Sequence, residues 1–206
     1  AKGQLFTQAG SYGTVINELR AGVTSAGTLC GVSNTAIEID PGVADDSLPR
    51  IQRISGIVSA AVARADEIGT TVIGKATAAI STPTGNSDVR DVESPMSNLV
   101  AQMFHEVLGN GDPYFIGVQN PGGTRDSFDS GDITYKEAAL TLPFANTLLT
   151  TRLTGTQFKT VLEQQWQRNA RGEIPSRPFL RLGLSSNVSY TYDESRPEGD
   201  RITSIF

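Results

Sequence analysis

The chain has 206 residues, of which 38% are hydrophobic and 19% charged, with a formal net charge of −5; this composition indicates one large globular domain, or one domain with an appendage. The acidic balance excludes a general nucleic-acid binder, which needs a basic surface, and the sequence holds no apolar run of about 18 residues that could span a membrane. Cys30 is the only cysteine, so a disulfide framework within the chain is excluded, and a buried, unreactive side chain is expected.

Short strands and one long helix are predicted for the N-terminal part of the chain. The helix covers residues 48–68, where apolar residues recur at helical spacing and Pro49 lies in the first turn. Residues 40–47 are interpreted as a linker before it, and a loop rich in proline, glycine and asparagine covers 81–88. Apolar runs bounded by turn residues place strands at 4–9, 13–20, 35–39 and 71–79.

Three further helices are assigned from their N-terminal capping residues. Ser94 is a suitable N-cap with Pro95 at the first helical position, so a helix is expected from there to about residue 109. Capping boxes predict two shorter helices, and they pair Thr134 with Glu137 and Thr154 with Gln157. Strands are expected at 114–119, 147–153, 178–183, 187–193 and 201–206. This mixture predicts an α+β fold, with a mixed sheet packed with helices, after a short β segment and a long linker helix.

Two short motifs contain residue types suited to an anionic ligand with a flat ring. The first is Asn120-Pro121-Gly122-Gly123-Thr124-Arg125, which follows the apolar, strand-like run at 114–118. Glycines let the backbone approach a ligand closely or adopt a positive φ, and the arginine offers a planar fork of donors for phosphate or carboxylate. The second is Leu142-Pro143-Phe144-Ala145-Asn146, in which Phe144 can present its ring to a flat ligand.

Arg90 is a further candidate for binding an anion. It lies just before the expected helix start at Ser94, where backbone N–H groups and the helix dipole also favour negative charge. Each candidate also has a plainer interpretation. Arg90 could form a surface ion pair with Glu93, Arg125 could be a solvated loop residue, Phe144 could belong to the core, and Asn120 could only stabilise its own turn.

The two motifs, with further segments in the same order, resemble the C-terminal domain of the 5'-nucleotidase / UDP-sugar hydrolase family. That family carries Asn-x-Gly-Gly-x-Arg and then Leu-Pro-Phe-Gly-Asn. Ser97 stands where the family usually has glycine. Segments that also match are 90–99, 132–135, 153–157, 188–193 and 196–201, and residues 6–13 resemble the strand that closes the family's N-terminal metallophosphatase domain.

The resemblance implies a role for each candidate residue. Arg90, Asn120 and Arg125 would bind the phosphate and ribose of a nucleotide, Gly122 and Gly123 would shape the turn between them, Phe144 would stack on the base, and Asn146 would hold the loop that carries Phe144. Stacking of this kind contributes on the order of 1–3 kcal/mol and tolerates many bases.

The resemblance also divides the chain into three parts. Residues 1–40 would be the end of a metallophosphatase domain, 41–69 a linker and connecting helix, and 70–206 a substrate-binding domain whose own end is missing. Neither catalytic residues nor metal ligands are expected in this chain, because His105 is its only histidine and is expected to be a partly exposed helix residue. The family's two divalent metal ions would lie in the missing N-terminal domain.

Together these expectations predict the substrate-binding domain of a secreted, periplasmic or cell-surface hydrolase that removes phosphate from nucleoside 5'-phosphates, with the metallophosphatase domain as its partner. Two alternatives stay open. One is a related cyclic-nucleotide phosphodiesterase or extracellular nuclease with the same C-terminal domain, which substrate profiling would distinguish. The other is a non-catalytic surface binding module, which a lack of metal ligands in the preceding domain would favour.

Overall fold

A computed structural model of the protein describes residues 6–40, 42, 45–85 and 88–206. It divides into two compact units, Ala1–Val62 and Ala63–Phe206, with the boundary inside helix α1 (Pro49–Gly69), and each unit is considered by itself. The predicted helix at 48–68 is therefore confirmed. In the described part of the chain, no helix combines the length and the apolar character that crossing a membrane requires.

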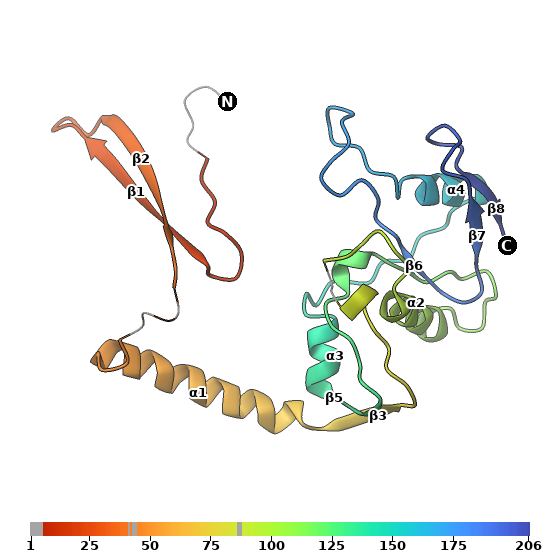
Figure 1. Ribbon diagram of the computed structural model, residues 1–206, viewed down its shortest axis with the longest axis horizontal. Helices are drawn as coiled ribbons and strands as arrows, with labels where there is room; N and C mark the ends of the chain where they lie inside the picture. The colour runs from red at the N-terminus through yellow and green to blue at the C-terminus, as the bar shows by residue number, and fades with distance from the viewer. Residues whose placement is uncertain (1–5, 41, 43–44, 86–87) are drawn as a thin grey trace. The chain divides into compact units, whose positions relative to one another are not determined.

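The first unit contains an antiparallel hairpin of β1 (Val15–Val23) and β2 (Leu29–Glu38), drawn in orange in Figure 1. These strands extend the predicted ones at 13–20 and 35–39. The strand predicted at 4–9 lies partly outside the described residues, and no strand forms at 6–10. Cys30 lies in β2 and is exposed rather than buried, because a two-stranded hairpin has no second layer within this unit to cover it.

The second unit contains short antiparallel strand pairs among its helices, which confirms the predicted α+β class. The strands form separate two-stranded sheets. These pair β3 (Val72–Ala76) with β5 (Gly131–Thr134), β4 (Val118–Gln119) with β6 (Gly183–Leu184), and β7 (Tyr190–Tyr192) with β8 (Ile202–Ile205). The predicted strand at 147–153 is wrong, because that segment forms no regular element. Strand β5 was not predicted.

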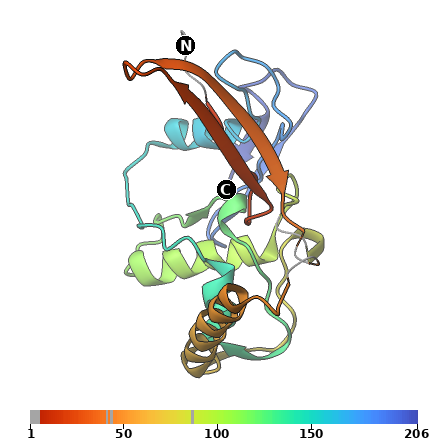
Figure 2. The same ribbon diagram turned by 90° about the vertical axis from the view of Figure 1, so that its left-hand side faces the viewer.

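Helix α2 (Pro95–Leu108) is the centre of the second unit and packs against β4 and β6 (Figures 1 and 2). It begins as predicted, since the Ser94 hydroxyl accepts a hydrogen bond from the Ser97 N–H at 3.1 Å. Its inner face contributes Met96, Val100 and Ala101 to the core. This places the start of α2 close to β4, which leads into the 120–125 motif.

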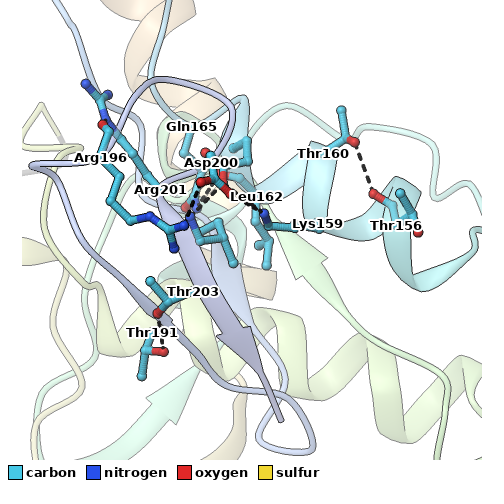
Figure 3. A network of polar contacts seen from close by, with 12 residues as sticks. Thr156, Lys159, Thr160, Leu162, Gln165, Thr191, Arg196, Asp200, Arg201 and Thr203 are labelled. Atoms are coloured by element: carbon cyan, nitrogen blue, oxygen red, sulfur yellow. Dashed lines mark hydrogen bonds and ion pairs between the residues drawn. The ribbon is translucent and has the colours of Figure 1, made fainter.

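Both predicted capping boxes are present, at the starts of α3 (Tyr135–Thr141) and α4 (Gly155–Glu163). Helix α3 is joined to the end of α1 by an ion pair between Lys136 and Asp66 at 2.7 Å. Helix α4 is joined to the connection between β7 and β8, as Figure 3 shows: Lys159 of α4 donates to Asp200, which also accepts a bond from Arg196 of the same connection. Trp166, which follows α4, packs on Phe179 and Tyr192 with ring centroids 4.8 and 5.5 Å apart.

Candidate functional site

Residues 120–125 form a tight turn, here called the 120–125 turn, directly after β4. Pro121–Gly123 is one turn of 3-10 helix, and Asn120 lies at its N-cap position. The Asn120 side chain is exposed and makes no capping hydrogen bond, whereas its carbonyl accepts the Gly123 N–H at 3.1 Å. Neither Gly122 nor Gly123 adopts a positive φ, so the two glycines serve close approach rather than an unusual backbone conformation.

The guanidinium of Arg90 lies against Gly122. A Cβ atom on Gly122 would stand 2.8 Å from Nη1 and 3.1 Å from Cζ of Arg90. The backbone of Arg90 is fixed independently, because its carbonyl accepts the Arg181 N–H at 2.7 Å. A Cβ on Gly123 would stand 2.9 Å from the Asn120 Oδ1. The fold thus brings four of the seven predicted ligand residues, Arg90, Asn120, Gly122 and Gly123, into one place.

We expect Gly122→Ala to displace Arg90 while changing stability little. The added methyl meets the far end of a flexible side chain, and the backbone needs no left-handed conformation. Affinity for inorganic phosphate should fall by about threefold to tenfold, or roughly 1 kcal/mol, when titration is followed by phosphorus NMR. Gly123→Ala is the matched comparison: its Cβ would lie 2.5 Å from Nε2 of the buried Gln119, so it should lower the melting temperature more. Unchanged phosphate affinity in Gly122→Ala would contradict this placement of Arg90.

A buried set of hydrogen bonds lies behind the 120–125 turn. The Ser97 hydroxyl donates to the Thr124 hydroxyl at 3.1 Å, and the Gln119 side-chain amide approaches the same oxygen at 3.4 Å. Ser97 and Thr124 are each 1% exposed, so these bonds are shielded from water and hold the turn against the start of α2. Sequence reasoning missed this set, although a serine in place of the usual glycine at 97 was a signal that could have found it.

Arg125 connects the turn to the second motif. Its side chain is half-buried, and its backbone N–H donates to the Thr141 carbonyl at the end of α3 at 2.9 Å. The 142–146 loop follows at once. Within it Phe144 is 57% exposed, Asn146 is exposed, and Ala145 has a φ of 48°. The Phe144 ring is therefore presented outward rather than packed in the core, and it lies on a loop anchored next to Arg125.

Arg90 and Asp88 both line a small pocket of about 110 Å³. The Asp88 Oδ1 lies 3.5 Å from Nη2 of Arg90 and 3.6 Å from Nη2 of Arg177. Arg177 was not among the predicted ligand residues. It comes from a distant segment of the chain, and no motif in the sequence indicated that it would meet Arg90.

A larger groove of about 620 Å³ runs along α2 beside residues 181–190, and no predicted ligand residue lines it. Tyr190 is part of its wall. Burial raises the pKa of the Tyr190 phenol, against the lowering effect of its hydrogen bond with Gln165. The Arg181 guanidinium lies 5.1 Å from the centroid of the same ring, so this wall is held by a cation–π contact.

Metal-binding side chains are not gathered in the described part of the chain. Its histidine, cysteine, aspartate and glutamate residues form no group of three or more that could hold a metal ion. His105 is half-buried, as expected, and its Nδ1 contacts the Phe115 carbonyl.

Comparison with known proteins agrees with the motifs. Residues 72–206 match the sequence model of the family described as "5'-nucleotidase, C-terminal domain". The trifunctional nucleotide phosphoesterase protein YfkN of Bacillus subtilis is 30% identical over 119 residues, which cover 57% of this chain and 8% of that protein. A probable 5'-nucleotidase of Treponema pallidum is 29% identical over 109 residues, which cover 50% of this chain and 18% of that protein.

A solved structure shares the fold as well. The crystal structure of the 5'-nucleotidase precursor from Thermus thermophilus has a TM-score of 0.57 and 25% sequence identity. The match covers 97% of this chain and 37% of that one. The chain thus spans only a part of the proteins that it resembles.

Proposed function

The chain belongs to the 5'-nucleotidase C-terminal domain family, and from that premise we propose that residues 70–206 bind the nucleotide substrate of a 5'-nucleotidase-like phosphohydrolase. The observation that carries the proposal is the packing of the Arg90 guanidinium on Gly122, beside Asn120. An arginine whose guanidinium packs closely against a glycine turn is a preorganised donor for an oxyanion.

The remaining candidate residues complete a nucleotide site. Arg125 supplies a second guanidinium next to the turn, and its backbone is fixed by the Thr141 carbonyl. Phe144 offers an exposed ring, and a base stacks on such a ring without regard to its identity. Asn120 hydrogen-bonds ribose or phosphate, and Asn146 supports the loop of Phe144.

The role of this chain would be to bind and orient the substrate. Orientation of this kind supplies a large part of many rate enhancements. Two divalent metal ions in a preceding metallophosphatase domain would activate water and polarise the phosphoryl oxygen; the described residues offer no ligand cluster for them. We also propose that the protein is secreted, periplasmic or on the cell surface.

Titration of the chain with AMP, adenosine and inorganic phosphate tests the site. We expect Arg125→Ala to weaken AMP by about tenfold or more, because a charge-assisted hydrogen bond contributes roughly 1.5–3 kcal/mol. Adenosine should be affected much less, since it lacks the phosphate. Arg125→Lys should restore only part of the affinity, because the planar fork of donors is lost. Equal affinity of wild type and Arg125→Ala for AMP would contradict the proposed function.

A further inference from the structure

One carboxylate is shared between two guanidinium groups at the edge of the proposed site. Asp88 Oδ1 lies 3.5 Å from Arg90 Nη2 and 3.6 Å from Arg177 Nη2. The three side chains line the same pocket of about 110 Å³, together with Asp91, Ser176, Pro178 and Phe179. Two arginines converging on one oxyanion is the arrangement that phosphate-binding sites use.

The shared ion pairs are long, and two of their three side chains are more than half exposed, whereas that of Arg90 is 21% exposed. They are longer than the tight ion pairs of this protein, such as Lys136–Asp66 at 2.7 Å and Arg196–Asp200 at 2.6 Å, and they belong with its loose pairs at 3.8–4.0 Å, such as Arg181–Glu93 and Lys75–Asp132. The Asp88 side chain is 64% exposed and that of Arg177 is 51% exposed. Ion pairs of this kind contribute little, so a ligand that binds both arginines more closely can displace the carboxylate.

A phosphate group is suited to this exchange. It carries more charge than a carboxylate, and its oxygens are arranged tetrahedrally, so two guanidinium groups can bond to different oxygens at once. Arg90 is the residue that connects the pocket to the proposed site, because the same guanidinium also lies against Gly122. A phosphate seated between Arg90 and Arg177 would therefore be continuous with the 120–125 turn.

We propose that Arg177 is a second phosphate-binding arginine beside Arg90, and that Asp88 occupies the place of the phosphate until the ligand displaces it. That a nucleotide supplies the phosphate group rests on the proposed function. That the two arginines bind a phosphate group does not depend on it. Asp88 thereby lowers the affinity of the site for anions, and Arg177 raises it.

The charged residues that line the pocket have no net charge in the absence of a ligand, since two arginines, Arg90 and Arg177, are matched by two aspartates, Asp88 and Asp91. Among the described residues Asp91 forms no ion pair with either arginine. This makes Asp91 the matched control, since Asp91→Asn removes the same charge from the same pocket without removing the competing anion.

The experiment titrates the whole chain with inorganic phosphate, AMP and adenosine at fixed ionic strength, using phosphorus NMR or calorimetry. Asp88→Asn should raise the affinity for phosphate and for AMP by about threefold to tenfold, because two weak competing ion pairs are lost. Arg177→Gln should weaken both by at least about fivefold. Asp91→Asn should change either affinity by less than about twofold, since a surface charge without a partner contributes little. Adenosine should bind all three variants as it binds the wild type.

Several outcomes would overturn the inference. Asp88→Asn could leave phosphate affinity unchanged or lower it, Arg177→Gln could bind AMP as the wild type does, or Asp91→Asn could tighten phosphate as much as Asp88→Asn. Phosphate binding undetectable in both wild type and Asp88→Asn would overturn it too. If Arg125→Ala weakens AMP while Arg177→Gln does not, the proposed function stands and the inference fails. If phosphate follows the expected pattern while AMP binds no better than phosphate, the inference stands and the nucleotide function fails.

Discussion

Phe144→Ala is expected to weaken the binding of AMP and of adenosine by about 1–3 kcal/mol, roughly fivefold to 150-fold in affinity. The affinity for inorganic phosphate should stay unchanged. The ring is 57% exposed on the 142–146 loop, so its loss removes a stacking surface and little packing. The melting temperature should change by only about a degree or two, because exposed substitutions usually shift stability by less than about 0.5 kcal/mol. Parallel titrations and thermal unfolding of the same samples measure both effects.

Tyr114→Ala is the matched control for this variant. Tyr114 is an aromatic residue with 88% exposure outside both motifs, so its loss should not change nucleotide affinity. The competing interpretation holds that Phe144 is structural. A drop in melting temperature with equal weakening of AMP, adenosine and phosphate would support that interpretation and exclude base stacking at Phe144.

The helices of this protein could be predicted from sequence because their signals are local. Ser94 caps α2 with its own hydroxyl, and the boxes at Thr134 and Thr154 close with partners three residues away. Such contacts form within one turn of chain. A reader of the sequence needs no knowledge of the rest of the fold to place them.

The strands were predicted less well because pairing depends on distant segments. Residues 147–153 have strand-forming composition, yet no segment of the described chain pairs with them. Strand β5 has a weak sequence signal, yet it pairs with β3 from Val72↔Thr134 to Ala76↔Gly131. In both segments, the presence or absence of a pairing strand decided whether a strand formed, and this outweighed the intrinsic strand propensity of the residues.

The candidate site divides along the same line. The 120–125 turn and Arg90 were predicted from motifs, and the fold brings them into contact. Arg177 could not be predicted, because its position beside Asp88 depends on how the segment around Pro178 folds back: the Gln167 N–H donates to the Pro178 carbonyl, and the Arg181 N–H to that of Arg90. Long-range backbone bonds of this kind leave no pattern in the sequence.

Glu163→Ala is expected to lower the free energy of unfolding by about 2–3 kcal/mol, which corresponds to a fall in melting temperature of roughly 5–10 °C. Glu163 is 8% exposed, and its Oε1 accepts the backbone N–H of Ile202, itself 1% exposed, at 2.6 Å. Removing the carboxylate leaves a buried N–H without a partner, and the bond that joins α4 to β8 is lost. Fluorescence of Trp166, the only tryptophan, reports on this region because its ring packs on Tyr192 of the adjacent strand β7.

Two further variants separate this bond from a general effect of charge. Glu163→Gln keeps an oxygen that can accept the Ile202 N–H. The Oε2 that it replaces has no hydrogen-bond partner among the described residues. The free energy of unfolding should therefore fall clearly less in Glu163→Gln than in Glu163→Ala. Glu106→Ala removes an exposed carboxylate that accepts a surface bond from Gln102 at 3.0 Å, and it should change stability by less than about 0.5 kcal/mol. If all three variants unfold alike, the Glu163–Ile202 bond does not stabilise the fold; if only Glu163→Ala is strongly destabilised, one buried acceptor on α4 holds the C-terminal strand pair in place.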